Sequence, residues 1–293
     1  EYHAYPPITA KFSNPIVRSI NSVKFLCYVM SGRRAMKRFD TMLTKVHFAE
    51  TTSYQELYRS IDHNLAYLDE RLIYHYASSS SSGSASSTLY MMLDKYFPDK
   101  KMYQSFLSHL LSNIPNIESA DILSRLQEMA ALIKKRNPEA VRFTADELLE
   151  YIKNDAETHA QYRDFLSRHG HRCIKEAEMR SKPWRDDEIP LMNYLQSIIN
   201  SPMNLVQSDE KIDLRKAFAF IRNPLLKRAS ILFAQKARQA VVDREYTKSR
   251  LIQIIDLFKQ QYARLAQQLV AAGLLADTDL IYFLTHPEIG NLI

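Results

Sequence analysis

The sequence predicts an all-α protein, and three observations support this fold class. Alternation of apolar and polar residues over four or more positions, the pattern of a half-buried strand, is nowhere convincing. Helix-start signals, by contrast, recur along the chain. Between Pro224 and Ala272 there is no further proline and no glycine, which predicts one very long helix near the C-terminus. Unbroken, this helix would be about 75 Å long, although a kink or a break is equally compatible with the sequence.

The N-terminal third is expected to contain three helices and a connection. Asn14 followed by Pro15 is an N-cap with proline at the first helical position, and it predicts a helix to about residue 30. A second helix is predicted over 33–48. A capping box at 53–56 begins a third, which is expected to reach about residue 76. The low-complexity serine tract at 78–87 is interpreted as a mobile connection between helices.

The remaining elements are also predicted to be helical, apart from an irregular stretch at 170–190. Gly273 is a natural C-cap for the long helix. Helices are predicted over 88–96, 99–112 and 120–136, from a capping box at 144–147 to about 170, over 191–200 and 209–222, and after a further capping box at 285–288.

We expect residues 1–293 to form a single helical domain of a larger protein. A subdivision into 1–77 and 88–293 is conceivable, with the serine-rich segment 78–87 as the connection. The chain stops inside its last predicted helix, which is typical of a piece cut from a longer polypeptide.

Composition is that of an ordinary soluble globular protein. Apolar residues make up 46% and charged residues 25%. No apolar run reaches the ~18 residues needed to span a bilayer, and Val23–Met30 is too short and interrupted for a signal sequence. The two cysteines, Cys27 and Cys173, form no disulfide framework and suit a reducing compartment. A cytoplasmic location is therefore expected, with no membrane partner.

The positive charge does not indicate a nucleic-acid partner. The formal net charge of +6 and the pI near 9.1 permit an anionic ligand. Acidic residues are interleaved with the basic ones, however, so no basic arm is visible. Because no recognised nucleic-acid motif is present either, we expect no nucleic acid among the partners.

The long predicted helix carries two cations in a place that calls for an explanation. On a helical wheel Arg244 projects from the middle of an apolar face, and Lys248 lies on its flank one turn later. Cations on a face that should be buried need either carboxylate partners, such as Glu176 or Glu178, or an anionic ligand such as phosphate. The apolar face consists of Phe233, Ala237, Ala240, Leu251, Ile255, Phe258, Tyr262, Leu265 and Leu269.

A second cluster of chemically capable residues lies within 169–184. His171 or Glu176 could serve as a general acid or base, and Trp184 could border a pocket, although structural roles are the commoner fate of such residues. Two histidines near two glutamates suggest a metal, but their spacing fits no standard zinc pattern, so no metal site is predicted.

In this order, these clusters resemble the central domain of rifampicin phosphotransferases and their phosphoenolpyruvate synthase-like relatives. The family's Y-G-H-R-G-P-G-E-x-D and R-P-x-W segments are matched by H-G-H-R-C-I-K-E-A-E-M-R-S-K-P-W at 169–184. Its A-R-x-x-V-x-x-R-E-x-T-K-S helix is matched at 237–249, and its L-x-D-x-D-L-I-x-F-L-T-x-x-E-L stretch at 275–289.

The resemblance implies a phosphotransferase of three parts. An ATP-grasp domain takes phosphate from ATP with Mg²⁺, a swivelling domain carries it on a histidine, and the central helical domain binds a small-molecule acceptor. It further implies that Arg244 and Lys248 stabilise the phosphoryl group in transfer. Arg172, Glu176, His171 and Trp184 would then shape the acceptor site. The ATP-grasp and phosphohistidine domains are expected on the same polypeptide.

Catalysis is not expected from this chain alone. It contains no glycine-rich nucleotide motif and no G-G-x-x-S-H segment, so no cofactor is predicted within it. The family's G-P-G is replaced by Cys173-Ile174-Lys175, which removes a flexible turn. A non-catalytic helical interaction or scaffold domain derived from the same fold is therefore the alternative. The acceptor itself cannot be read from the sequence.

Overall fold

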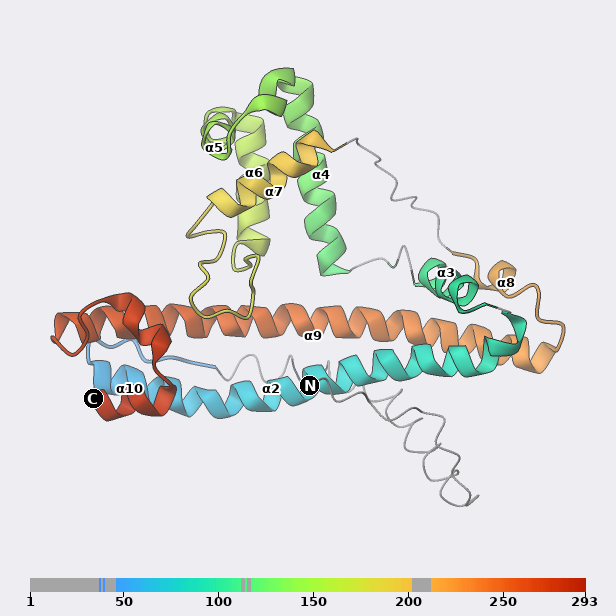
Figure 1. Cartoon of the computed structure of the whole chain (residues 1–293), viewed down its shortest axis with the longest axis horizontal. Coiled ribbons are helices and arrows are strands. Elements are labelled where there is room, and N and C mark those ends of the chain that lie inside the picture. Colours follow the sequence, from blue (N-terminus) through green and yellow to red (C-terminus); the bar gives the residue numbers. More distant parts are fainter. Residues whose placement is uncertain are drawn as a thin grey trace, which may run out of the picture.

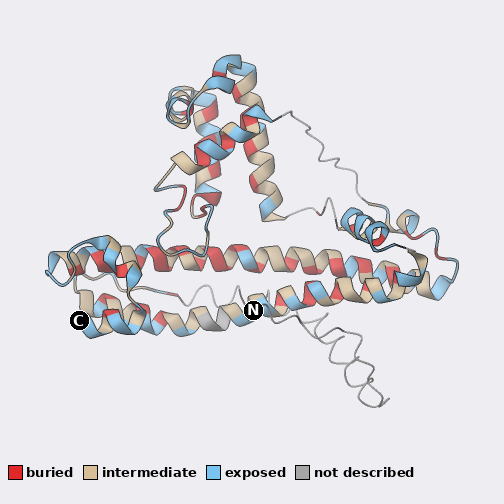
Figure 2. Cartoon of the chain, viewed as in Figure 1, coloured by how far each residue is buried: buried red, intermediate tan, exposed pale blue. Residues whose placement is uncertain are grey.

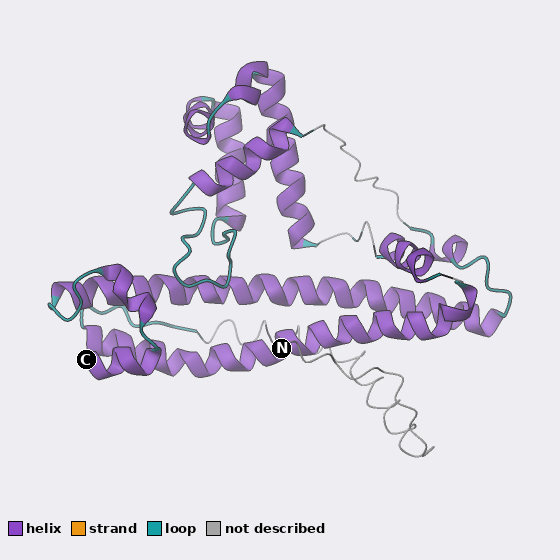
Figure 3. Cartoon of the chain, in the orientation of Figure 1, coloured by secondary structure: helices purple, strands orange, loops and turns teal. Residues whose placement is uncertain are grey.

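The structure, a computed structural model, describes residues 37, 39, 46–97, 99–111, 114, 117–201 and 212–293. Every regular element in these residues is helical, which confirms the all-α prediction (Figure 3). In chain order, with η denoting a 3₁₀ helix, the elements are α2 (Tyr54–Leu93), η1 (Asp94–Tyr96), α3 (Lys100–Leu110), α4 (Glu118–Arg136), η2 (Pro138–Arg142), α5 (Ala145–Asn154), α6 (Ala156–His169), α7 (Ile189–Asn200), α8 (Leu214–Ala217), α9 (Pro224–Ala271), η3 (Thr278–Phe283) and α10 (His286–Leu292).

Two long antiparallel helices, α2 and α9, form the base of the molecule (Figure 1). Near the middle of both, the hydroxyls of Ser78 and Thr247 lie 2.7 Å apart. Near one end, the side chains of Arg264 and Gln268 on α9 donate to the carbonyl of Thr51, just before α2. Helix α9 runs unbroken for 48 residues, roughly 70 Å, so the long helix predicted from the sequence is continuous.

The serine tract corrects one sequence-based prediction. Residues 78–87, expected to be a mobile connection, lie inside α2, which continues for 40 residues. Ser78, Ser81, Ser82 and Ala85 are buried at helical spacing. On α9, small residues such as Ala237 are also buried, so the two backbones can approach closely here. A composition typical of linkers therefore forms a helix–helix contact.

Other helix boundaries also differ from the predictions. The capping box at Thr144 is confirmed, but the region after it is two helices, because Asp155 ends α5 and its side chain caps α6 at the backbone N–H of Thr158. Residues 46–50 are not helical, so the helix predicted over 33–48 does not reach residue 48. The helix predicted over 209–222 is reduced to α8 within the described residues. The helix predicted over 14–30 lies outside them.

A small helical group, formed by α4, η2, α5, α6 and α7, stands beside the middle of α9 (Figure 1). It has its own apolar core, visible as buried inner helix faces in Figure 2. The segment between α6 and α7, residues 170–188, leaves this group, runs along α9 and returns (Figure 1). The largest contributions to the core come from Leu126, Met129, Ile133, Leu148, Ile152, Phe165, Leu191, Met192 and Leu195.

The two ends of the α2–α9 pair are closed by different elements. At one end α3 packs against α2 through an edge contact of Tyr103 with Tyr90, with ring centroids 4.9 Å apart, and Phe106 of α3 contacts Phe218 just after α8. At the other end η3 and α10 close the core through Ile281 and Ile289. Gly273, with a φ of +73°, allows the chain to turn back after α9. The capping box at Thr285 begins α10 as predicted.

Two glycine substitutions test this packing in opposite directions. A Cβ at Gly290 in α10 would lie 2.3 Å from the hydroxyl oxygen of Tyr58, so Gly290→Ala must displace that ring. We expect it to lower the free energy of unfolding by about 1–3 kcal/mol. Gly83 in α2 has open space around it, so Gly83→Ala should raise stability by about 0.5–1 kcal/mol through helix propensity alone.

Urea unfolding monitored by circular dichroism measures both effects. A Gly83→Ala variant less stable than the parent would contradict the helical assignment of the serine tract. A neutral Gly290→Ala variant would contradict the docking of α10 on Tyr58.

Candidate functional site

The candidate site lies along a seam on α9 between two buried strips. One strip, including Thr247, Leu251 and Phe258, faces α2. The other includes Ser249 and Asp256 and lies beneath α4 and the 170–188 segment. On an ideal wheel Arg244 and Lys248 fall about 50° and 90° from the centre of the first strip, which places them between the two.

Arg244 and Lys248 are consequently less buried than the sequence predicted. The Arg244 side chain is 41% exposed and pairs with its neighbour Glu245 at 2.7 Å. The Lys248 side chain is 48% exposed, and its Nζ lies 3.3 Å from a carboxylate oxygen of Glu176. The expectation that Arg244 projects from the middle of a buried face is therefore wrong, because the face buried against α2 is turned toward Thr247.

Beside Lys248, a buried ion-pair network holds the 170–188 segment in place. Arg172, 5% exposed, donates to Glu176 at 2.6 Å and to Glu118, the first residue of α4, at 3.3 Å. Ser249 on α9 also donates to Glu118. Glu176 thus accepts from Arg172 on one oxygen while facing Lys248 with the other. The network connects the small helical group, the irregular segment and α9.

A polar group on α2 completes the surroundings of the two cations. Thr247 Oγ1 lies 3.1 Å from Nδ1 of His75. Burial lowers the pKa of His75, and nearby Lys248 and Arg244 lower it further, against an opposing effect of Glu245. His75 therefore lies within electrostatic reach of both cations and is neutral at pH 7.

The remaining predicted site residues lie deeper in the structure. Trp184 is 7% exposed and packs on Phe165 in the core of the helical group, with ring centroids 5.9 Å apart. His171 is partly buried, and its Nε2 has no hydrogen-bond partner among the described residues. Burial, then the charge of Arg172, lowers the pKa of His171 to about 4. Glu178 faces neither Arg244 nor Lys248 and instead lines a cavity.

This cavity is largely apolar and lies farther along the same seam. Its volume is about 390 Å³. Ile255 and Tyr262 line it, and on an ideal wheel both share the direction of Arg244 to within about 20°. Ile255 lies about 10 Å along the helix axis from Lys248. The full lining is Leu65, Leu68, Glu178, Met179, Ile255, Phe258, Tyr262, Ile281, Tyr282, Leu284, His286 and Ile289.

At the far end of the cavity a polar cluster joins three elements. The hydroxyl of Tyr262 lies 2.8 Å from Nδ1 of His286, and Asp62 lies 3.3 Å from Nε2 of the same ring. Tyr58 stacks on His286 with ring centroids 4.4 Å apart. Burial raises the pKa of Tyr262 to about 12, so its hydroxyl remains protonated at physiological pH.

Sequence reasoning did not identify several residues of the site. Glu118, Glu245 and His75 are among them, and each comes from a different element or pairs in a way that spacing does not reveal. The only available signal for Glu118 was an acidic residue at the start of a predicted helix. Glu176, which was named as a partner for the cations, does pair with Lys248.

The described part of the chain has neither a metal-ion cluster nor a membrane-spanning helix. No group of three or more histidine, cysteine, aspartate or glutamate side chains there is arranged to hold a metal ion. Among the same residues, no helix combines the length and the hydropathy needed to cross a bilayer.

Fold and site together define a helical domain in which a charged segment and a long helix meet. The sequence profile described as the rifampicin phosphotransferase fourth domain matches residues 75–250, more than half of the chain. The chain therefore belongs to that family. The match includes the second half of α2, the helical group, the 170–188 segment and α9 as far as Arg250. Most of the apolar cavity's lining lies outside it.

Arg172 is a buried cation and Lys248 is a half-exposed one, and this difference leads to a stability prediction. Arg172→Met leaves Glu118 and Glu176 without their buried partner, so we expect a loss of about 2–4 kcal/mol in the free energy of unfolding. Lys248→Met removes a half-exposed pair and should cost less than about 1 kcal/mol. Urea denaturation of the two variants side by side gives the comparison, and equal losses would contradict the network.

His171 predicts a pH dependence of stability. Its pKa of about 4 in the folded protein lies below the usual 6.5, so between these values the unfolded chain binds more protons. The free energy of unfolding should therefore fall as the pH drops from about 6.5 to 4. Because the ring remains partly solvated, we expect His171→Gln to reduce this fall by roughly 1–2 kcal/mol. Urea titrations across this range test it, and an unchanged pH profile would count against it.

Proposed function

We propose that this chain is the acceptor-binding domain of an ATP-dependent phosphotransferase. A phosphohistidine carrier domain, charged by an ATP- and Mg²⁺-using domain, would deliver the phosphoryl group to it. Both partner domains would belong to the same polypeptide and lie outside this chain. The observation that carries the proposal is the pair of accessible cations, Arg244 and Lys248, one turn apart on the seam that leads to an apolar cavity.

The accessibility of the two cations supports a role in contacting phosphate. Each cation is 41–48% exposed, although its carboxylate partner is more buried. A solvated charge gains little from its ion pair, so either cation can turn toward an incoming anion at small cost. An arginine can donate to two phosphoryl oxygens at once, and a lysine adds a mobile point charge. Stabilising charge on the transferring group in this way is the main contribution proteins make to phosphoryl transfer.

The apolar cavity supports a role in holding the acceptor. Its volume of about 390 Å³ falls within the range of small-molecule sites, and apolar walls with a few polar groups are typical of them. An acceptor seated there would lie along the seam toward Lys248. Arg172 and Glu176 would act indirectly, because their buried ion pair sets the position of the 170–188 segment beside both the cations and the cavity.

The proposal is tested in the full-length protein with three matched variants. Arg244→Ala and Lys248→Ala should each lower the rate of phosphoryl transfer to the acceptor by roughly 10²–10³-fold, as the loss of a preorganised charge does in other enzymes. Lys236→Ala removes an exposed cation from the same helix, away from the site, and should leave the rate unchanged. Transfer at the parent rate by Arg244→Ala would overturn the assignment.

A helical scaffold or interaction domain derived from the same fold is the second candidate. It is favoured by the observation that Arg172, Arg244 and Lys248 all have carboxylate partners already. The coding sequence on either side of this chain discriminates the two. Intact ATP-grasp and phosphohistidine regions support the enzyme, whereas their loss supports the scaffold.

A further inference from the structure

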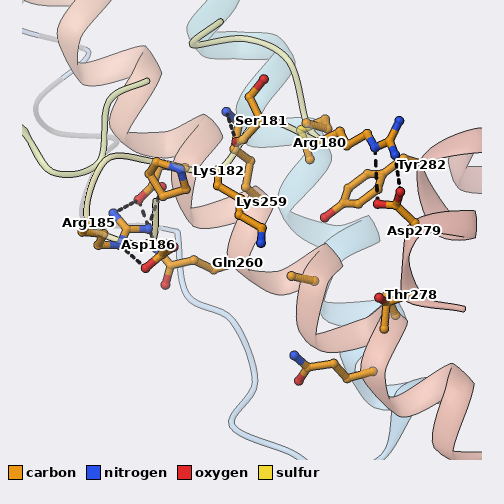
Figure 4. A pocket seen from close by; sticks show the side chains of 16 residues that line it. Arg180, Ser181, Lys182, Arg185, Asp186, Lys259, Gln260, Thr278, Asp279 and Tyr282 are labelled. Carbon is orange, nitrogen blue, oxygen red and sulfur yellow. Dashed lines mark hydrogen bonds and ion pairs between the residues drawn. The ribbon is translucent and has the colours of Figure 1, made fainter. Parts of the chain in front are cut away.

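A second cavity, of about 420 Å³, lies on the other side of Met179 from the apolar one. It is enclosed by the 179–186 segment, the C-terminal part of α9 and η3. Figure 4 shows Lys182, Lys259 and Arg185 on one side of it and Arg180, Asp279 and Tyr282 on the other. Four cationic side chains thus line a single cavity, against three carboxylates.

Lys259 on α9 is the most deeply buried of these cations. It is only 7% exposed, and no carboxylate of the described residues lies within ion-pair distance of its Nζ. Its Nζ donates to the carbonyl of Ser181 at 3.2 Å and to Sγ of Cys173, a weak acceptor, at 3.5 Å. An ammonium group has three protons to donate, and a buried charge is costly unless it is paired. Lys259 therefore lacks a counter-charge.

The acids of the cavity are already engaged by its arginines. Asp256, which is 4% exposed, accepts from two nitrogens of Arg185, at 2.7 and 2.9 Å. Asp279 is paired with Arg180 on the side of the cavity opposite Lys259. The third carboxylate, Asp186, lies 3.7 Å from Arg185. None of the three lies within 4 Å of the Lys259 ammonium, so Lys259 has no carboxylate partner in the cavity.

We propose that this cavity binds a small oxyanion, a phosphate or carboxylate group, on Lys259. Lys182 also lines the cavity and adds a second positive charge to its lining (Figure 4). The oxyanion would supply the missing counter-charge and accept the remaining ammonium proton. The volume of the cavity leaves room for the rest of a small metabolite attached to that group.

This site is separate from the phosphoryl site proposed above. Lys259 lies 11 residues after Lys248 on the same straight helix, about 16 Å along its axis. Its side chain contacts Cys173 and Ser181, whereas Lys248 faces Glu176. The inference does not depend on the proposed function, because it rests only on the burial and partners of Lys259.

Binding is tested with the 293-residue chain, using inorganic phosphate and acetate as probes at constant ionic strength kept with chloride. Isothermal titration and thermal shift should show binding of at least one probe. Lys259→Met, which keeps the length of the side chain without its charge, should weaken that binding at least tenfold. Lys236→Met, an exposed control on the same helix, should leave it unchanged. A response to phosphate alone assigns a phosphoester ligand, and a response to acetate alone assigns a carboxylate.

Two outcomes would overturn the proposal. One is that neither probe binds better than chloride. The other is that binding survives in a folded Lys259→Met variant. If that variant does not fold, the chemical shifts of the parent chain decide the matter. On titration, the amides of residues 180–186 and 256–267 should move, and movement confined to the surroundings of Arg244 would refute the site.

Discussion

The antiparallel packing of α2 on α9 is the interaction on which the rest of the structure depends. Each of the other elements either closes an end of this pair or stands on α9 (Figure 1). The contact is close because both helices present small residues where they meet, including Ser78 and Ala85 on α2 and Ala234 and Ala237 on α9. The buried hydroxyls of Ser78 and Thr247 lie against each other and each donates to a carbonyl of its own helix, so neither is left unpaired.

This packing also determines where chemistry can occur. Because α9 is covered by α2 on one strip and by the 170–188 segment on another, the residues between the two strips are half-exposed. Arg244 and Lys248 lie there, as do Ile255 and Tyr262 of the apolar cavity's lining. The buried pairs of Arg172 and Asp256 act differently, since they attach the irregular segment to α4 and α9. The accessible charges of Arg244 and Lys248 thus lie on a different face of α9 from the buried carboxylate of Asp256.

Much of the fold could be predicted because it follows from local signals. The capping boxes at Thr144 and Thr285 and the stretch without glycine or further proline after Pro224 are local patterns, and the structure confirms the helices that they predict. The prediction for the serine tract was wrong because linkers and close helix–helix contacts can share the same small-residue composition. Only the presence of a partner helix distinguishes the two. The break between α5 and α6 at Asp155 was not predicted for a related reason, since an aspartate that caps one helix can also lie inside another.

The sequence by itself determined the all-α fold class, the stretch without glycine or further proline that forms α9, and the motifs that place the chain in its family. The tertiary structure alone decided which charges are paired and which are accessible. Glu118, Glu176 and Lys248 are brought together from α4, the irregular segment and α9, and Lys259 is buried without a carboxylate only because of how that segment crosses the helix. Helix periodicity is a local property that the order of residues specifies, whereas an ion pair between distant segments depends on how the helices pack.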